Sequence, residues 1–489
     1  MFSSGVATRL GEINFKGVLK EIRIVGVKDP CELHRRNPEN FKTAFQAAMD
    51  TARDIPVSAP PMPSAIPVSD GETPDFHTTD LGNAKRLVTS FGSKLRYCHL
   101  SGKWHIYDGT RWAQDDTGAI YRLARKTVAS IYREAAAATD SATRRALAAH
   151  ASRSESESRI RAMVTLATSE EGIPVTPREL DADPYKLNVK NGTIDLRTGM
   201  LHPHNPSDLI TKVAAVSYDP GAQAPLFDRF MTRIMDGNAN QIRFLQVFLG
   251  YCLTGDTREE VFLIGFGEGA NGKTTLIETI AAIIKDYVVT ADFRSLAVRR
   301  SDGPRNDIAR LRGARFVPAV EAGEGLRLDE ELIKRLTGRD TISARFLYGE
   351  YFDFKPQFKL ILATNHKPRI AGTDRAIWRR IRLVPFLVTI PEREQDKSLP
   401  EKLLAEAPGI LNWLLEGCRD WQKNGLGYPD EVRLATDAYR SEEDPLADFL
   451  SLDVLTGQGQ KATAGDLYQA YRRRCERNGE DPIPQRTFG

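Results

Sequence analysis

The stretch that decides the fold is Gly267-Glu-Gly-Ala-Asn-Gly-Lys-Thr274. It matches the phosphate-binding loop pattern, in which two glycines, a lysine and a serine or threonine stand at fixed spacings. An apolar run at 261–264 precedes the loop, and a helix-compatible stretch at 275–284 follows it. This strand, loop and helix context predicts that the chain binds a nucleoside triphosphate, and it argues against the alternative of a chance glycine-rich turn.

The residue types of the loop suit a polyphosphate. Glycines let the backbone wrap around phosphate oxygens and aim N–H groups at them, beside the positive end of the following helix. Lys273 adds a positive charge for the outer phosphates, and Thr274 offers a hydroxyl of the kind that Mg²⁺ prefers. The predicted nucleotide-binding residues are Gly267, Glu268, Gly269, Ala270, Asn271, Gly272, Lys273, Thr274 and Thr275.

Composition limits the class of protein. The chain has 489 residues, enough for about three domains with hydrophobic cores. Its formal net charge is only +3, so a surface for nucleic acid would have to be a local patch or channel. The five cysteines show no CxxC spacing, which favours a reducing compartment. With no signal peptide and no apolar run of roughly 18 to 20 residues, we expect a cytoplasmic protein without a membrane partner.

The amino-terminal part of the chain contains a proline-rich segment. Residues 56–75 carry six prolines among small polar residues, which predicts an interdomain linker. The segment before it resembles, over Gly26–His34 and Phe41–Phe45, the end of toprim-type domains of phage and plasmid primases. We therefore expect residues 1–55 to be the remnant of such a domain. Because the catalytic acids of a toprim domain would lie outside the chain, we expect no primer synthesis by it.

A mixed pattern of helix and strand follows the linker. The segment Trp104–Trp112 alternates aromatic and polar residues around an Asp-Gly turn, and Asn191–Gly199 has glycine turns at both ends of a short strand. Both segments predict hairpins, with helices between them up to about residue 170. The tryptophans could stack on bases, but such residues more often pack in a core.

Two strands after the loop end in polar residues that suit phosphate chemistry. The run Ala314–Glu321 ends in a carboxylate, which could hold the Mg²⁺ shell or orient the attacking water, and Glu324 could share that task. The run Phe358–Asn365 ends in an amide, which can position a water by donating and accepting hydrogen bonds. The alternatives are an ordinary strand end and a loop-starting asparagine.

A pair of arginines completes the set. Arg379 and Arg380 follow Trp378, and a fixed guanidinium charge could reach the γ-phosphate in a neighbouring subunit as an arginine finger. Paired arginines on a helix are usually solvated, so this interpretation depends on the order of all four elements.

That order resembles the superfamily 3 helicases of the phage, plasmid and poxvirus primase-helicase type. The resemblance is carried by Glu321–Glu350, Asn365-His-Lys-Pro-Arg369 and Trp378-Arg-Arg380, and the Asn191-Gly192 segment resembles the region that precedes these motors. It implies an α/β fold: an AAA+-like P-loop NTPase core, a mixed α+β amino-terminal region, and a helical, winged-helix-like carboxy-terminal domain. The winged-helix-like part stops before any wing, which, with the partial toprim-like segment, suggests a shortened chain.

The resemblance also implies roles for the motif residues. Lys273 and Thr274 take the Walker A roles with ATP and Mg²⁺ as cofactors, and Glu321 becomes the Walker B acid and second metal ligand. The sequence here reads Val-Glu-Ala-Gly-Glu, so either Glu321 alone or Glu321 with Glu324 handles metal and water. Asn365 becomes the sensor amide. The remaining implied catalytic residue is the finger in trans, either Arg379 or Arg380.

Relatives of this type work as rings, usually hexamers, around DNA. The resemblance implies a channel hairpin near 341–354, with Lys334, Arg335 and Arg345 as candidate phosphate contacts; a surface salt bridge is the alternative for each. The expected regions are 1–55 (toprim-like remnant), 56–75 (linker), 76–222 (helicase amino-terminal region), 223–395 (ATPase domain) and 396–489 (helical region and partial winged helix).

The leading hypothesis is an ATP hydrolase, a DNA helicase that translocates as a ring during replication of a phage, plasmid or integrated mobile element, with a primase or other replication proteins as partners. The alternative is an ATP-switched DNA-binding initiator or assembly platform without unwinding activity. Such a platform has no need of the hydrolytic set Lys273, Glu321, Asn365 and Arg379, which argues against it. A small-molecule kinase is disfavoured because no acceptor-binding motif follows the loop.

Overall fold

The computed structural model describes residues 19–21, 53–55, 76–299, 305–320, 327–346, 349–370, 375–444, 446–455, 457, 459–479 and 482–488. The chain divides into two units, Met1–Asp75 and Phe76–Gly489. In the first unit, the described residues form one antiparallel pair, β1 (Leu19–Glu21) with β2 (Arg53–Ile55). The rest of the predicted toprim-like remnant and the predicted linker at 56–75 lie outside the described residues.

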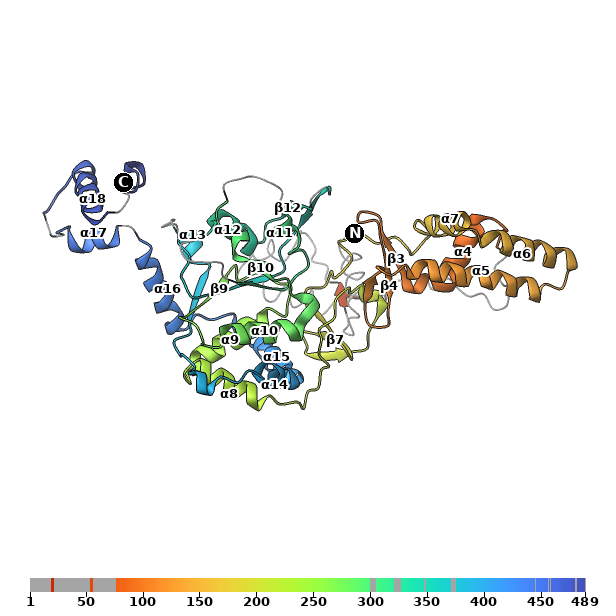
Figure 1. The fold of residues 1–489 in the computed structure, drawn as a ribbon, viewed down its shortest axis with the longest axis horizontal. Helices are drawn as coiled ribbons and strands as arrows, with labels where there is room; N and C mark the ends of the chain where they lie inside the picture. Colours follow the sequence, from red (N-terminus) through yellow and green to blue (C-terminus); the bar gives the residue numbers. More distant parts are fainter. Residues whose placement is uncertain are drawn as a thin grey trace. The chain divides into compact units, whose positions relative to one another are not determined.

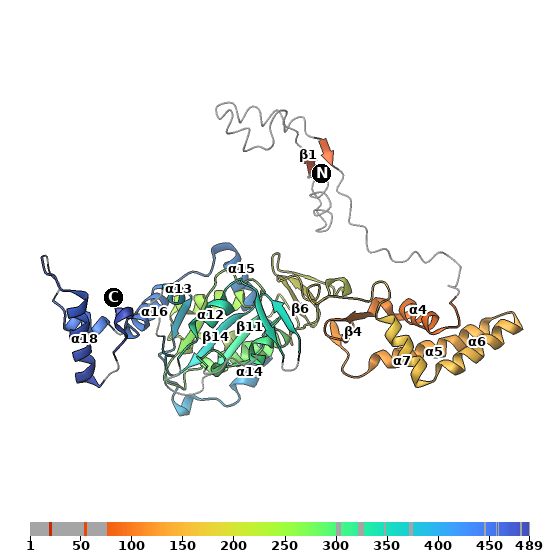
Figure 2. The same ribbon diagram turned by 90° about the horizontal axis from the view of Figure 1, so that it is seen from above.

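The second unit begins with four helices and two small antiparallel sheets. Its first elements are α4 (Asp80–Phe91), η1 (Gly92–Lys94), β3 (Leu95–Cys98), β4 (Lys103–Tyr107), β5 (Trp112–Gln114), α5 (Ala119–Ala137), α6 (Ser141–Ser154), α7 (Glu157–Ala167), β6 (Lys186–Val189), β7 (Gly192–Asp195), β8 (Met200–His202) and η2 (Pro206–Asp208). Strands β3, β4 and β5 form one sheet, and β6, β7 and β8 form the other. Figure 2 shows the four helices lying together.

Both predicted hairpins are confirmed, as β4–β5 and β6–β7–β8. Trp104 is 9% exposed and Trp112 is 1% exposed, and the Trp112 indole N–H donates to the carbonyl oxygen of Pro206 at 2.8 Å. These tryptophans therefore pack in the interior, which confirms the core interpretation over base stacking.

A five-stranded parallel sheet forms the centre of the unit, in the order β10-β11-β14-β9-β15. The elements of this part are α8 (Pro225–Ile234), α9 (Ala239–Tyr251), β9 (Phe262–Phe266), α10 (Lys273–Ile284), η3 (Lys285–Tyr287), β10 (Ala291–Asp292), η4 (Phe293–Ser295), α11 (Asn306–Ala309), β11 (Phe316–Val320), α12 (Glu330–Thr337), β12 (Ile342–Arg345), β13 (Tyr351–Phe354), β14 (Lys359–Thr364), α13 (Arg375–Trp378) and β15 (Ile381–Pro385). The strands predicted at 261–264, 314–321 and 358–365 are confirmed as β9, β11 and β14.

Helices cover both faces of this sheet, as its apolar strands require. Leu263 of β9 belongs to a core shared with α8, α9, α10 and two later helices, α14 (Leu399–Ala405) and α15 (Ala407–Asn424). Its neighbours Phe262 and Ile264 belong to a second core with α11 and α12. Figure 1 shows these two groups of helices on opposite sides of the strands.

Helices α9 and α15 pack unusually closely. A Cβ atom added at Gly250 would lie 2.2 Å from the backbone nitrogen of Cys418, so only glycine allows this approach. Because α15 lies beyond residue 395, the core around the sheet continues past the boundary predicted for the ATPase domain.

The described residues after Pro385 that form secondary structure are all helical. They are η5 (Glu392–Glu394), α14, α15, α16 (Asp430–Glu442), α17 (Ala447–Leu452), α18 (Ala464–Asn478) and α19 (Gln485–Phe488). Phe449, Tyr471 and Cys475 form a small separate core. Among the described residues, none of the helices combines the length and apolar character needed to cross a bilayer. The second unit is thus a mixed α/β structure with a parallel sheet and a helical carboxy-terminal region.

Candidate active site

The predicted phosphate loop joins β9, which lies between β14 and β15 in the sheet, to helix α10. Leu276, Ile280 and Ile283 are buried at helical spacing, so they anchor α10 against the sheet and fix its amino-terminal end beside the loop. Because β9 is parallel to both of its neighbours, the loop lies at the carboxyl edge of the sheet, where open α/β folds bind ligands.

Two glycines give the loop its shape. Gly272 has a φ of 81°, and a Cβ atom there would lie 2.4 Å from Cγ2 of Ile234. A Cβ atom at Gly267 would lie 2.3 Å from the carbonyl oxygen of Phe386. The loop is further held by the backbone N–H of Ile390, which donates to the carbonyl oxygen of Ala270 at 2.7 Å. A side chain at Gly267 would therefore displace the chain that follows β15, and one at Gly272 would displace the end of α8.

Lys273 lies inside the loop and is 5% exposed. Its ammonium donates to the carbonyl oxygen of Gly267 at 2.7 Å and to the side-chain oxygens of Asn271 and Asn365, both at 3.1 Å. Asn365 directly follows β14, so two motifs that are 92 residues apart meet at one ammonium group. The structure thus brings the predicted lysine and the predicted sensor amide together.

The other predicted loop residues differ in exposure. Asn271 is buried, and its amide donates to the carbonyl oxygen of Phe386 at 3.4 Å. Thr274 and Glu268 are exposed, and Thr275 is partly buried. The Thr274 hydroxyl, in the first turn of α10, is therefore accessible to a ligand at the positive end of that helix.

The predicted acids follow a strand that reaches the same edge. Strand β11 pairs in parallel with β14, with Val320 opposite Ala363, and β14 pairs with β9, with Thr364 opposite Phe266. The three strands therefore end at nearly the same level. Glu321 and Glu324 lie outside the described residues, and their roles stay predictions.

The two candidate finger arginines have different surroundings. Arg380 is 8% exposed, and its guanidinium donates to Glu260 at 3.1 Å and to the carbonyl oxygen of Ala376 at 2.8 Å. The side chain of Arg379 is 62% exposed and lies 3.6 Å from the same Glu260 carboxylate. Arg380 is thus held in the interior, while Arg379 reaches the surface. Nothing in the sequence marks Glu260 as a functional residue, because a lone glutamate in a loop carries no motif.

The hairpin predicted near 341–354 is present as β12 and β13, which pair from Ile342 opposite Phe354 to Arg345 opposite Tyr351. The guanidinium of Arg345 lies 4.8 Å from the centre of the Tyr351 ring. Phe346 and Tyr351 are 48% and 65% exposed. The tip of the hairpin thus presents two aromatic rings to solvent, with the partly buried Arg345 beside one of them.

The other two predicted DNA contacts lie elsewhere. Lys334 and Arg335 lie on helix α12, where Lys334 is partly buried and Arg335 is exposed. The structure therefore places only Arg345 on the hairpin.

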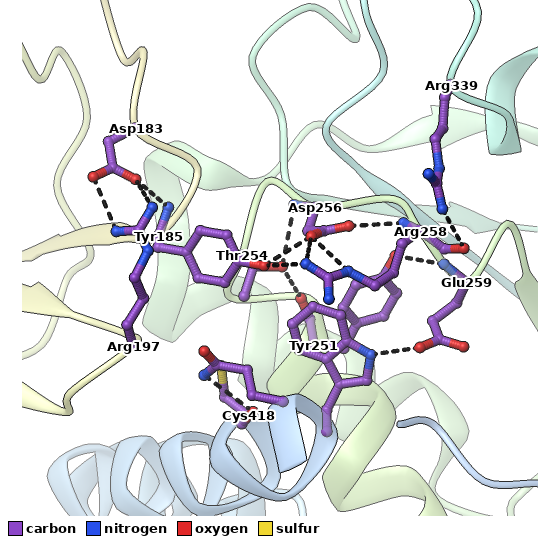
Figure 3. Close-up of polar contacts among 12 residues, drawn as sticks. Asp183, Tyr185, Arg197, Tyr251, Thr254, Asp256, Arg258, Glu259, Arg339 and Cys418 are labelled. Carbon is purple, nitrogen blue, oxygen red and sulfur yellow. Dashed lines mark hydrogen bonds and ion pairs between the residues drawn. The ribbon is translucent and has the colours of Figure 1, made fainter. Parts of the chain in front are cut away.

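A polar network connects Tyr185, which directly precedes β6, to residues 256–260, which lead into β9 (Figure 3). The Tyr185 hydroxyl donates to the Asp256 carboxylate at 2.7 Å, and Arg258 donates to the Tyr185 oxygen at 2.8 Å. Burial would raise the pKa of Asp256, but hydrogen bonds from Arg258 and Tyr185 outweigh burial and hold this pKa below its ordinary value. Burial, with the bond to Asp256, raises the pKa of Tyr185 to about 12.

The same network reaches helix α15. The Trp421 indole N–H donates to Glu259 at 2.8 Å, and the Arg258 guanidinium lies 5.1 Å from the Trp421 ring. Residues 256–260 therefore connect three parts: the β6–β8 sheet, α15, and the arginines after α13 through Glu260. No pattern in the sequence indicated these contacts, since Tyr185 and Asp256 are 71 residues apart.

Two buried cations support the opposite edge of the sheet. Lys359 is 2% exposed, and its ammonium donates to the carbonyl oxygen of Asp256 at 3.1 Å; burial lowers its pKa to about 7. Arg315 is 5% exposed and donates to the carbonyl oxygens of Leu253 and Lys186 at 2.7 and 2.8 Å. Both side chains bind backbone oxygens of the segment that follows α9, so they fix where β11 and β14 begin.

Two parts of the chain match known protein families. Residues 84–236 match a family model described as D5 N terminal like, and residues 266–380 match a family of unknown function (DUF5906). Similar proteins include viral proteins named as helicases or primases. The chain is therefore a relative of the phage- and virus-type primase-helicases, which confirms that part of the resemblance found in its motifs.

These similar proteins come from viruses. A protein of Acanthamoeba polyphaga mimivirus named "Putative helicase" is 30% identical over 320 residues, which are 60% of this chain and 33% of that protein. A Frog virus 3 protein of the same name is 31% identical over 242 residues, 45% and 24% of the two chains. An African swine fever virus protein named "Putative primase" is 22% identical over 306 residues, 56% and 31% of the two chains.

The chain spans about a quarter to a third of the length of these curated relatives. Among solved structures, the A form apo structure of the NrS-1 C terminal region matches with a TM-score of 0.47 at 13% identity, covering 74% of each chain.

Proposed function

We propose that this chain is a superfamily 3 type, AAA+-like ATPase that works as an ATP-dependent DNA helicase. The observation that carries the proposal is the contact between Lys273 and Asn365 at the carboxyl edge of the sheet. Strand β14 lies between β9 and β11, so the amide stands between the phosphate loop and the strand that leads to Glu321. A lysine, an amide and an acid in that order are the groups that a phosphoryl-transfer site needs.

The residues present fit ATP with Mg²⁺. The loop already curves through the left-handed conformation at Gly272, and the Thr274 hydroxyl is exposed at the helix end. ATP supplies the phosphoanhydride bond that is hydrolysed, and Mg²⁺ neutralises charge on its phosphates. Lys273 would bind the outer phosphates, and Thr274 with Glu321 would hold the metal ion. Asn365 would orient the attacking water, with Glu321 or Glu324 accepting its proton.

Arg379 suits the role of a finger in trans better than Arg380. A finger must reach a phosphate bound to another subunit, and the exposed guanidinium of Arg379 can do so. Arg380 would first have to break its buried contacts with Glu260 and Ala376. The proposal therefore implies an oligomeric ring, with one subunit completing the site of the next.

Mixing two inactive variants tests this shared site. Lys273→Ala removes the loop lysine, and Arg379→Ala removes the finger. If the finger acts in trans, a mixture contains interfaces with an intact loop from one variant and an intact finger from the other, so ATP hydrolysis recovers. If the mixture is as inactive as the two separate variants, the finger role of Arg379 is wrong.

The DNA part of the proposal rests on the relatives named as helicases and on the β12–β13 hairpin. Exposed aromatic rings and a cation are suited to stacking on bases and contacting phosphates. Displacement of a labelled strand from a forked duplex, with ATP and with the Lys273→Ala variant as control, tests unwinding. ATP- and DNA-dependent displacement supports the helicase, whereas DNA binding without displacement would indicate the initiator or assembly platform.

A further inference from the structure

A cavity of about 620 Å³ lies where the segments 177–182 and 211–212 face the end of strand β13. This volume is in the range of pockets that hold small ligands. Its charged lining residues are Arg178, Asp181, Lys212, Arg312, Asp353 and Lys355. Four basic side chains thus face two acidic ones, a formal net charge of +2 in a chain whose overall charge is only +3. The cavity is therefore a local concentration of positive charge.

The cations of this cavity are not neutralised by ion pairs within the part of the chain that the structure describes. Other arginines nearby are paired, as Arg197 is with Asp183 at 3.0 Å. One of the two acids, Asp181, accepts a hydrogen bond from the backbone N–H of Thr211 at 2.8 Å and another from its hydroxyl, so its carboxylate is already engaged. The arrangement favours an anion as occupant.

Contacts between the two walls hold two of the cations, Arg312 and Lys212, in place. The Arg312 guanidinium lies 5.3 Å from the ring of Phe352 on β13, and it donates to the carbonyl oxygen of Pro177 at 3.4 Å. Gly313 lies against Lys212, since a Cβ atom there would be 3.4 Å from Cε of that lysine. Part of the entropy cost of ordering these long side chains is therefore met before a ligand arrives.

The neighbouring hairpin indicates which anion. The cavity includes Asp353, Phe354 and Lys355 at the root of the β12–β13 hairpin, and Phe346 and Tyr351 are exposed at its tip. A positive groove next to aromatic rings is the arrangement by which proteins bind single strands, with phosphates on the cations and bases on the rings. A free nucleotide would need only the cavity and would leave the rings without a ligand.

We propose that this cavity binds backbone phosphate of a single-stranded nucleic acid whose bases stack at the hairpin tip. It extends the proposed function, because it requires that the chain binds DNA, but it does not require ATP hydrolysis. Arg178 and Lys212, which precede the parallel sheet in the sequence, then bind the same nucleic-acid strand as Arg312 and Lys355, which lie in the part of the chain that contains the sheet.

The test is equilibrium binding of a fluorescein-labelled oligothymidylate, followed by anisotropy over a series of salt concentrations without ATP. The cavity variant combines Lys212→Gln, Arg312→Gln and Lys355→Gln, which removes three charges and keeps a polar side chain at each position. The control variant combines Lys126→Gln, Arg133→Gln and Lys423→Gln, three exposed residues on α5 and α15. Thermal unfolding of each variant verifies that the fold is kept.

The cavity variant should bind more weakly, and the slope of log K against log salt should shrink by roughly 2, about 0.7 for each lost phosphate contact. The control variant should keep the wild-type slope. Equal slopes for the cavity variant and the wild type would overturn the proposal. So would displacement of the oligonucleotide by thymidine monophosphate at a comparable concentration, because the cavity would then be a site for free nucleotides. Since ATP is absent, neither result depends on whether the chain hydrolyses it.

Discussion

Arg315 should be among the most costly single residues to replace, although it carries no motif. It directly precedes β11, the strand that leads to Glu321, and the described residues provide no carboxylate for its guanidinium. Its partners are the carbonyl oxygens of Leu253 and Lys186 at 2.7 and 2.8 Å and the ring of Tyr287 at 4.6 Å. The substitution Arg315→Met would keep the volume and leave two buried carbonyl groups without a donor.

The expected loss follows from these contacts. Hydrogen bonds to a charged group are worth about 1.5–3 kcal/mol each, and a carbonyl left buried without a partner loses its solvation as well. Removing the buried charge returns part of the cost of its desolvation. We therefore expect Arg315→Met to lower the free energy of unfolding by about 3 to 5 kcal/mol. Arg315→Lys should lose less, because one ammonium group can still donate to one of the two oxygens.

The assay is urea denaturation followed by tryptophan fluorescence and by far-ultraviolet circular dichroism. Arg310→Met is the matched control, since Arg310 is an exposed arginine of the same segment, and surface substitutions usually change stability by less than about 0.5 kcal/mol. A loss of less than about 1 kcal/mol for Arg315→Met, or a loss equal to that of Arg310→Met, would refute the reasoning about buried carbonyl groups.

Three further predictions concern the site and its support. Asn365→Ala should reduce ATP hydrolysis by on the order of a hundredfold, because the attacking water is no longer positioned, while ATP affinity should stay nearly unchanged. Steady-state kinetics and equilibrium binding measure these two quantities. An equal fall in affinity would contradict a positioning role. Arg379→Ala should abolish turnover without lowering the thermal midpoint, whereas Arg380→Ala should lower that midpoint, and the reverse pattern would exchange their roles. Burial lowers the pKa of Lys359 to about 7 from 10.5, so between these values the unfolded chain binds the extra proton. The stability of the wild type relative to Lys359→Met should therefore rise as the pH increases from about 7 to about 10, and a constant difference in denaturation measurements would count against this burial.

The sequence predicted the elements that have local signals. The phosphate loop, the strands at its sides and the two hairpins each depend on alternating patterns, apolar runs or turn residues within a few positions. Parallel strands bring their carboxyl ends to one edge, so the meeting of Lys273 with Asn365 also follows from strand order. Tryptophans beside a hairpin more often pack in a core than stack on bases, and the burial of Trp104 and Trp112 confirms this interpretation.

Other contacts depend on tertiary structure and have no local signal. Arg315 and Lys359 bind backbone oxygens of the segment after α9, which is distant in the sequence. Nothing in the sequence distinguishes these two residues from the other basic residues. Glu260 contacts the arginines that follow α13. The sequence around Glu260 does not indicate this contact. The basic cavity is likewise formed by segments around residues 180, 212, 312 and 355, which are far apart in the sequence. The nearly neutral composition of the chain therefore does not predict the local positive charge.

The most direct test of the central claim is ATP hydrolysis by the purified chain with and without single-stranded DNA, alongside Lys273→Ala. We predict turnover that single-stranded DNA stimulates and that Lys273→Ala abolishes, since Lys273 is the group that joins the phosphate loop to Asn365. ATP binding without hydrolysis in either condition, or turnover that survives Lys273→Ala, would contradict the assignment of a DNA-dependent motor.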